Sequence, residues 1–202
     1  MNELRELINQ LETSNGNEVF TLQKINELFL TKLMISIKED LVLYPTEVEA
    51  YYNHVTRFPD SSVHMNELQQ NRFGKLYFHR KGKKKENAIL FWNYGGIDVC
   101  LSGGNYYLSI LIRSARINSE VKPISGPCKL LWEVVDWVCN EDNIQKLSEE
   151  NTATLNQLEE KVVLVETDNN DMRTVASISV TKRIGIYKGD YVEVPLRSFI
   201  GK

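Results

Sequence analysis

The stretch AILFWNYGGIDVCLSGGNYYLSILIR, residues 88–113, decides the fold class. Its apolar runs are rich in β-branched and aromatic residues, and Gly and Asn separate them, which is typical of strands joined by turns. Similar segments occur earlier, in EVEAYY at residues 47–52, and again after residue 160, in KVVLVE, VASISV, RIGIY and YVEVPLRSF. We therefore expect the middle and the end of the chain to form a β-sheet.

Helical patterns flank the expected sheet. Apolar residues recur at three- and four-residue spacing over residues 4–11 and 22–33, and Thr21 is the expected N-cap of the second helix. A third helix is predicted over residues 125–138, where Ser125 can cap the first turn and leucines and valines form one apolar stripe.

These elements predict a single α+β domain. Residues 1–38 are expected to form N-terminal helices, and residues 39–202 a mixed, mostly antiparallel curved β-sheet with flanking helices. The polar residues 140–161 are expected to form short helices and turns. No repeat or low-complexity linker divides the sequence.

The composition is that of an ordinary globular protein. The chain has 202 residues, of which 42% are apolar and 25% charged, and this excludes a disordered or fibrous protein. Its three cysteines, Cys100, Cys128 and Cys139, form no CxxC pair, and its three histidines lack metal-ligand spacing. We expect a cytoplasmic protein without disulfide, metal or cofactor. The sequence contains no signal-peptide pattern and no apolar run of about 20 residues, so no membrane contact is expected.

Charge is distributed unevenly along the chain. The formal net charge is −3, but residues 71–90 carry seven Lys and Arg side chains against Glu86 alone. The tip of this region, KGKKKEN at residues 81–87, lies between two strand-like segments, as expected for a hairpin that contacts nucleic-acid phosphates. A solvated loop is the alternative, because charged loop tips are common.

Two glutamates lie on one face of an expected strand. Glu47 and Glu49 are two residues apart, and Tyr51 follows on the same face. A carboxylate beside an aromatic ring can act as a general base for water while the ring stacks on a flat ligand, and a solvated sheet edge is the alternative. Arg113 lies in an apolar strand, where a buried guanidinium needs a carboxylate partner. Glu49 is the natural candidate, so we expect these two side chains within ion-pair or single-water reach.

The order of several short motifs resembles that of the alkyladenine (3-methyladenine) DNA glycosylase family. EVEAY, DSSVH, NRFG and GKLYFH, between residues 47 and 79, are similar to the family's E-T-E-A-Y, D-x-A-x-H, N-R-G and G-x-L-Y-V-Y. Further along, YG with VCLS, LIRSA, SGPCKL, RIGI and PLRSF are similar to its Y-G-M-x-x-C-x-N, L-L-R-A, S-G-P-x-K-L, R-V-G-V and P-L-R-F. The resemblance extends from about Pro45 to the C-terminus and implies an alkyladenine-glycosylase-like fold.

The resemblance also implies roles for residues of a base-flipping active site. Glu49 would activate water for attack on C1′ of the damaged nucleotide, and Arg113 would position that water. Tyr51 and His64 would contact the extruded base, and Tyr77 would orient His64.

Further positions carry over from the same family. His79 takes the place of a second stacking tyrosine, Tyr94 lies near the tyrosine that fills the vacated space in the duplex, and Ser102 takes the place of an asparagine that screens out guanine. Contacts to DNA are assigned to Tyr94 and to the basic residues Arg72, Lys81, Lys83, Lys84 and Lys85.

We therefore expect a monofunctional DNA glycosylase of base excision repair that removes alkylated or damaged purines. The catalytic segment contains no lysine, so simple hydrolysis without lyase activity is expected. The protein is expected to be a cytoplasmic, nucleoid-associated monomer that binds duplex DNA and needs no cofactor. Two alternatives remain. One is a catalytically inactive nucleic-acid-binding protein of the same fold that uses the Lys-rich hairpin, and the other is a structural domain with neither binding nor pocket.

Overall fold

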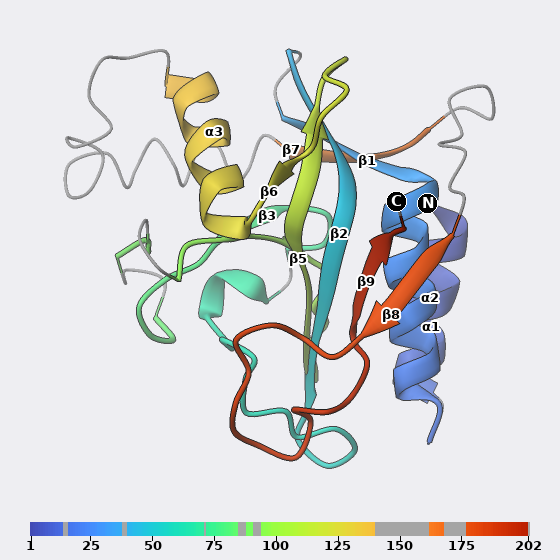
Figure 1. The fold of residues 1–202 in the computed structure, drawn as a ribbon. Coiled ribbons are helices and arrows are strands. Elements are labelled where there is room, and N and C mark those ends of the chain that lie inside the picture. The colour runs from blue at the N-terminus through green and yellow to red at the C-terminus, as the bar shows by residue number, and fades with distance from the viewer. Residues whose placement is uncertain are drawn as a thin grey trace.

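The computed structural model shows one β-sheet with helices packed on both of its faces (Figure 1). The structure describes residues 1–13, 16–37, 40–70, 72–84, 88–90, 94–139, 162–167 and 177–201. The described strands are β1 (Leu33–Ile37), β2 (Leu41–His54), β3 (Leu76–Phe78), β4 (Ile97–Cys100), β5 (Tyr106–Ile117), β6 (Ile124–Ser125), β7 (Val162–Glu166), β8 (Ile178–Thr181) and β9 (Arg197–Ile200).

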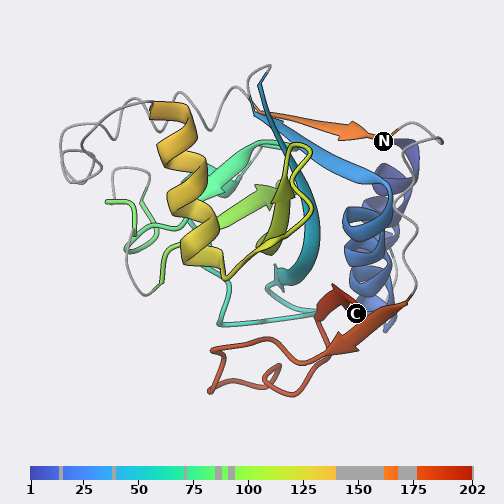
Figure 2. The same ribbon diagram turned by 45° about the horizontal axis from the view of Figure 1, so that its top comes forward.

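The strand order in the sheet is β3-β4-β5-β2-β1-β7, with β6 paired to β5, β9 paired to β2 and β8 paired to β9. Every pair among the described strands is antiparallel. The expected α+β class and the mostly antiparallel pairing are therefore confirmed, whereas the described strands contain none of the parallel pairs that a mixed sheet would have. The long strand β2 pairs with β1 through residues 41–43 and with β9 through residues 47–49, and the sheet curls around β2 and β5 (Figure 2).

Three described helices cover the sheet. The helices α1 (Asn2–Thr13) and α2 (Glu18–Thr31) pack on one face, and α3 (Pro127–Cys139) packs on the other (Figures 1 and 2). Side chains of β2 alternate between these faces, because successive residues of a strand point in opposite directions. Val48, Ala50 and Tyr52 are fully buried in the core that includes α1 and α2. The opposite face therefore carries Glu47, Glu49 and Tyr51. The helix α3 and the loop over residues 182–196 lie on this face.

An irregularity in the β2–β5 pair positions Arg113. Glu47 pairs with Ser114 and Val48 pairs with Ile112, so Arg113 is an extra residue in β5. Such a bulge increases the local twist and redirects the side chain of the unpaired residue. The Arg113 side chain thereby reaches carboxylates of the neighbouring strand.

The beginning of the chain differs from the sequence prediction in two respects. The helix α2 begins at Glu18, and the Thr21 hydroxyl donates to the carbonyl of Asn17 at 3.1 Å inside the helix, so the N-cap role expected for Thr21 is wrong. The helix ends at Thr31, and β1 follows, pairing with both β2 and β7. The boundary drawn at residue 38 therefore cuts a hairpin, because the apolar side chains of β1 follow the two-residue period of a strand.

Two further expectations are corrected near the candidate site. The segment RIGIY, residues 183–187, and the first six residues of YVEVPLRSF, residues 191–196, belong to a loop over residues 182–196 and not to strands. Gly185 has a φ of 83°, a left-handed conformation that regular strands do not contain. Ser125 lies in β6, and the carbonyl of Gly126 accepts the first helical bond of α3, from the Leu130 N–H at 3.0 Å, so Gly126 precedes the helix in place of Ser125.

The remaining expectation on secondary structure, for residues 140–161, lies outside the described residues. Among the helices that the structure describes, none has the length and apolar character needed to cross a bilayer.

Candidate active site

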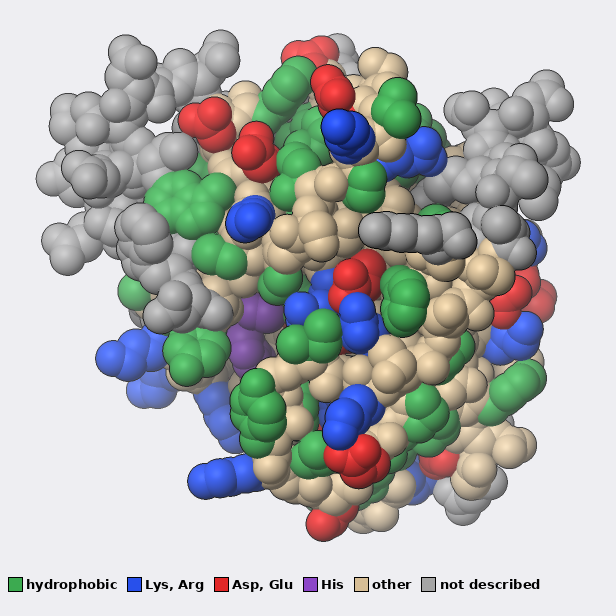
Figure 3. All heavy atoms as spheres, viewed as in Figure 1, with side chains coloured by type: hydrophobic (Ala, Val, Ile, Leu, Met, Phe, Trp, Pro, Cys, Tyr) green, Lys and Arg blue, Asp and Glu red, His purple; other side chains and the backbone are tan. Residues whose placement is uncertain are grey.

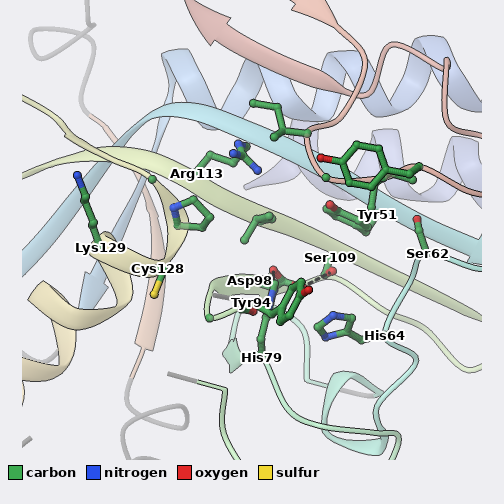
Figure 4. Close-up of a pocket in the computed structure, with 18 residues that line it drawn as sticks. Tyr51, Ser62, His64, His79, Tyr94, Asp98, Ser109, Arg113, Cys128 and Lys129 are labelled. Carbon is green, nitrogen blue, oxygen red and sulfur yellow. Dashed lines mark hydrogen bonds and ion pairs between the residues drawn. The ribbon is translucent and has the colours of Figure 1, made fainter. Parts of the chain in front are cut away.

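A cavity of about 620 Å³ lies on the face of the sheet that carries Glu49 and Tyr51. Its walls come from β2, β4, β5, the segment after β2, the segment between β3 and β4, the N-terminus of α3 and the loop over residues 182–196. Figure 3 shows histidine side chains inside a hollow on this side of the molecule, with Lys and Arg side chains to its left. Figure 4 shows the labelled side chains that line the cavity.

The Glu49 carboxylate lies just behind the cavity wall. It is fully buried and is not among the residues that line the cavity. Its Oε1 accepts the backbone N–H of Ile184 at 2.7 Å, and its Oε2 accepts Tyr51 Oη at 3.0 Å and Arg113 Nη1 at 3.3 Å. Burial raises the pKa of Glu49 above its usual value, and the Arg113 charge offsets only part of this effect.

Two carboxylates share Arg113. Besides the expected contact with Glu49, Arg113 Nε donates to Glu47 Oε1 at 2.9 Å. The same Glu47 oxygen accepts Arg197 Nε at 2.7 Å. Both glutamates of the EVE motif thus hold one guanidinium, and Arg113 itself lines the cavity.

Tyr51 is held from behind by a second arginine. The Arg183 guanidinium lies 4.7 Å from the centroid of the Tyr51 ring, and Arg183 is paired with Asp60 at 2.7 Å in the protein interior. Burial and the neighbouring Glu49 carboxylate raise the pKa of Tyr51 well above its usual value. The hydroxyl therefore stays protonated and donates to Glu49, while the ring contributes to the cavity wall.

His64 lines the cavity as a neutral ring. Burial and the adjacent His79 lower the pKa of His64 to about 4. Its Nδ1 lies 3.3 Å from Tyr77 Oη, and that hydroxyl accepts the N–H of Arg80 at 3.2 Å. The expected proximity of Tyr77 and His64 is present, although Tyr77 is fully buried behind the cavity wall.

His79 also lines the cavity and is paired with a buried acid. Its Nε2 lies 2.8 Å from Asp98 Oδ1, and its Nδ1 lies 3.1 Å from the carbonyl oxygen of Tyr94. Burial by itself would lower the pKa of His79, but the Asp98 carboxylate, the Tyr94 carbonyl and the Glu49 charge together outweigh burial and raise the pKa. Burial likewise opposes ionisation of Asp98, yet His79 and the Ser109 hydroxyl, which donates at 2.8 Å, lower the pKa of Asp98.

The structure places two predicted residues away from the cavity. The Ser102 hydroxyl donates to the carbonyl of Leu108 and accepts the Leu108 N–H, at 3.1 and 3.0 Å, and Ser102 is not a lining residue. The Arg72 side chain is half-buried and donates to the carbonyl of Leu68 at 3.4 Å. Ser102 thus has a structural role in a strand connection, and Arg72 is partly engaged with the protein itself.

The basic segment before β4 is exposed and anchored. Lys81, Lys83 and Lys84 are exposed, whereas Lys85 lies outside the described residues. The amide of Asn66 donates to the carbonyl oxygens of Gly82 and Lys84, at 3.1 and 2.9 Å. Asn66 also caps the short helix η1 (Glu67–Gln69), so the lysine tip is attached to an ordered turn.

Tyr94 and Tyr187 expose large aromatic side chains at the cavity. Both line it, and 78% and 85% of their surfaces are accessible to solvent. Tyr94 was predicted to contact DNA, whereas Tyr187 was not assigned a role. Its exposed ring follows the RIGI motif directly, which is the signal that could have indicated it.

Sequence reasoning also missed Asp98 and Ile184. Asp98 is a charged residue between Ile97 and Val99, so the argument that gave Arg113 a partner applies to it equally. Ile184 contributes only its backbone N–H, for which a side-chain pattern carries no signal.

Comparison with known proteins adds no assignment. No family model matches the chain, and no curated protein matches it. Within the described part of the chain, no group of three or more His, Cys, Asp or Glu side chains is arranged to hold a metal ion.

Proposed function

We propose that this protein is a monofunctional DNA glycosylase with an alkyladenine-glycosylase-like fold that hydrolyses the N-glycosidic bond of a damaged purine. The observation that carries the proposal is the Glu49 carboxylate, buried against Arg113 beside a cavity with flat side chains in its walls. The cavity volume, about 620 Å³, is within the range of pockets that hold small organic ligands. An extruded purine fits this class of pocket, since base-flipping enzymes hold the base between planar side chains.

Glu49 is the general base in this mechanism. Its contact with Arg113, at 3.3 Å, is longer than those with Ile184 and Tyr51, so a water molecule enters most easily between Glu49 and Arg113. Such a water donates to Glu49 and remains next to the guanidinium. The raised pKa of Glu49 makes the carboxylate a stronger proton acceptor than an exposed glutamate.

The reaction balances with water as the only co-reactant. The water oxygen forms a bond to C1′ as the C1′–N bond breaks, the bonding electron pair leaves with the base, and Glu49 accepts the water proton and then releases it to solvent. A cationic base leaves as a neutral molecule, whereas an uncharged base leaves as an anion and takes up one proton from solvent. Positive charge develops on the sugar in such reactions, and a nearby carboxylate stabilises it. The products are a free base and an abasic site.

The exposed surface next to the cavity supports a nucleic-acid substrate. Lys81, Lys83 and Lys84 are exposed cations, and contacts between such side chains and phosphates hold DNA without reading its sequence. Tyr94 and Tyr187 offer exposed rings on which bases next to the extruded nucleotide stack.

The competing function is nucleic-acid binding without catalysis. One observation favours it: both Glu49 oxygens are already engaged by protein groups, and the carboxylate does not contact the cavity directly. An inactive protein of this kind would keep the lysine surface and would release no base.

Base release under single-turnover conditions tests the proposal. The protein is incubated with duplexes that contain 3-methyladenine, hypoxanthine or ethenoadenine, and free base and abasic sites are quantified. We expect release of at least one of these bases, and a rate that is ~10²- to 10⁴-fold lower in Glu49→Gln. Glu193→Gln is the matched control, because Glu193 is an exposed carboxylate whose ion pair is with Lys182, which is exposed as well.

Two outcomes contradict the proposal in different ways. Release that persists in Glu49→Gln removes Glu49 from the mechanism. Absence of release from every duplex, together with salt-sensitive DNA binding, supports the non-catalytic function.

A further inference from the structure

The hydrogen bonds of His79 define its charge. The Tyr94 carbonyl can only accept a hydrogen bond, so His79 Nδ1 carries a proton. On the other side of the ring, Asp98 receives the Ser109 hydroxyl at 2.8 Å and the Gln69 amide at 3.5 Å on Oδ2, and Oδ1 faces His79 Nε2. An acid surrounded by donors is ionised, and it then accepts from Nε2 as well. Both ring nitrogens are donors, which is the imidazolium form.

The position of this ring is fixed by a glycine. A Cβ at Gly96 would lie 2.8 Å from Cε1 of His79, and the Gly96 carbonyl accepts the backbone N–H of His79 at 3.0 Å. The imidazolium is therefore packed in one place and held at both nitrogens. The ring of His79 lines the cavity next to that of His64, with the two ring centroids 4.4 Å apart.

The cavity consequently has a cation in the wall that includes both histidines. Figure 4 shows His64 and His79 together, below Tyr51 in that view. Besides Arg113 and Lys129, which line the cavity, the Arg183 guanidinium lies over one face of the Tyr51 ring. The charges that face His79 are the Asp98 carboxylate and, further away, that of Glu49, while His64 is neutral.

We propose that the His79–Asp98 pair makes this cavity selective for uncharged damaged purines over purines that carry a positive ring charge. This inference rests on the proposed glycosylase function and specifies its substrate class. Hypoxanthine and ethenoadenine belong to the first class, and 3-methyladenine and 7-methylguanine to the second.

The selectivity follows from ring electrostatics. The face of a neutral aromatic ring is electron-rich and attracts a cation, so an uncharged purine stacks favourably on an imidazolium. A cationic purine is repelled by the same ring, and removal of bulk water from the cavity strengthens this repulsion. On the Tyr51 side, the Arg183 guanidinium already lies over one face of the ring, and its positive charge offsets the attraction of that ring for a cationic base.

Asp98→Asn tests the proposal with almost no change of shape. The asparagine amide donates to His79 Nε2, which then loses its proton, while Nδ1 keeps its bond to Tyr94. The readout is the ratio of single-turnover release rates for 7-methylguanine and hypoxanthine duplexes. The titration of Glu49 affects both substrates alike, and the intrinsic reactivity of each base is the same for both proteins. Neither effect therefore changes the comparison of this ratio between the wild type and the variant. We expect the ratio to rise about tenfold in Asp98→Asn. Asp136→Asn, which removes an exposed carboxylate on α3, is the control and leaves the ratio unchanged.

Nitrogen NMR of the histidine rings provides an independent measurement. Wild-type His79 is expected to have both ring nitrogens protonated at pH 7, and the Asp98→Asn protein only one. If Asp98→Asn is poorly folded, the double variant His79→Phe with Asp98→Asn replaces the charged pair by a neutral ring and a neutral amide.

The outcomes separate this inference from the proposed function. A neutral His79 in the wild-type protein overturns it, and so does an unchanged ratio in a variant whose ring has lost its charge. If no duplex releases a base, the glycosylase proposal fails. In that case the affinities for the 7-methylguanine and hypoxanthine duplexes are measured by fluorescence anisotropy. An affinity ratio that is equal in the wild type and in Asp98→Asn overturns the selectivity.

Discussion

Replacement of Glu49 by glutamine separates a catalytic carboxylate from a structural ion pair. A buried salt bridge that loses one partner costs ~3–5 kcal/mol, because a charge is left unpaired. Glu49 is different, since its partner Arg113 also binds Glu47 at 2.9 Å and keeps a counter-charge in the variant. The two interpretations of Glu49 therefore predict different stabilities for Glu49→Gln.

The structure allows the expected change to be worked out contact by contact. Glutamine keeps Oε1 as the acceptor of the Ile184 N–H. At the Oε2 position its amide reverses the bond with Tyr51, because it donates to Tyr51 Oη, and the bond from Arg113 Nη1 is lost. A hydrogen bond to a charged group contributes ~1.5–3 kcal/mol. Against this loss, the variant no longer buries an ionised carboxylate, which costs several kcal/mol. We expect the free energy of unfolding to stay within about 1 kcal/mol of the wild type or to rise.

The stability difference between Glu49→Gln and the wild type is expected to change with pH in a defined direction. Burial raises the pKa of Glu49 in the folded protein above its ordinary value of 4.5. Its contribution to stability is therefore complete below pH 4.5 and is lost as the pH rises through the folded pKa. Glutamine does not titrate, so Glu49→Gln gains stability relative to the wild type as the pH rises from 4.5 towards 7.

Chemical denaturation at several pH values measures this difference. A variant that is destabilised by ~3 kcal/mol or more at pH 7 would refute the reasoning, because it would make the carboxylate a stabilising ion pair. A stability deficit that grows with pH would have the same meaning, since it requires a depressed pKa. Glu193→Gln again provides the control for an exposed carboxylate.

Three further predictions concern the surroundings of the site. The double variant Lys83→Gln with Lys84→Gln should lower the salt dependence of DNA affinity by a slope of ~2, with base release at saturation unchanged, and a salt titration of binding checks this. Ser102→Ala leaves the Leu108 N–H without its acceptor and should cost ~1–3 kcal/mol in denaturation, and any new release of guanine would instead return Ser102 to the pocket. Borohydride should trap no covalent complex with DNA. Lys129 lines the cavity, but its side chain extends away from the acids and histidines that Figure 4 labels. A trapped complex that is lost in Lys129→Gln would contradict simple hydrolysis.

The parts of the fold that were predictable from sequence depend on local patterns. The two-residue alternation of EVEAYY and the apolar runs around Arg113 identified β2 and β5, which form the centre of the sheet. The residues of β1 were assigned to a helix because Leu33 continues the apolar spacing of α2, and only pairing with β2 and β7 fixes it as a strand.

The candidate site was predictable where a physical requirement acted on one residue. A guanidinium inside an apolar strand demands a carboxylate, and this requirement identified the contact between Arg113 and Glu49. The contact from Ile184 to Glu49 spans 135 residues and uses a backbone N–H, so no spacing in the sequence encodes it. The loop that contains Ile184 has the pattern of a strand in sequence, because Ile184 and Ile186 alternate with other residues. The left-handed conformation of Gly185 turns the chain there.

The pKa values of the two buried acids beside the cavity are shifted in opposite directions, and this difference agrees with the separate roles proposed for them. Burial dominates at Glu49 and raises its pKa, because Arg113 is shared with Glu47 and contacts Glu49 only at 3.3 Å. At Asp98, His79 and the Ser109 hydroxyl outweigh burial and lower the pKa. A group that is to accept a proton from water needs the first environment, and a group that is to hold a fixed charge needs the second. Glu49→Gln should therefore remove release of every base, whereas Asp98→Asn should change which bases are released, and the reverse pattern would exchange the two assignments.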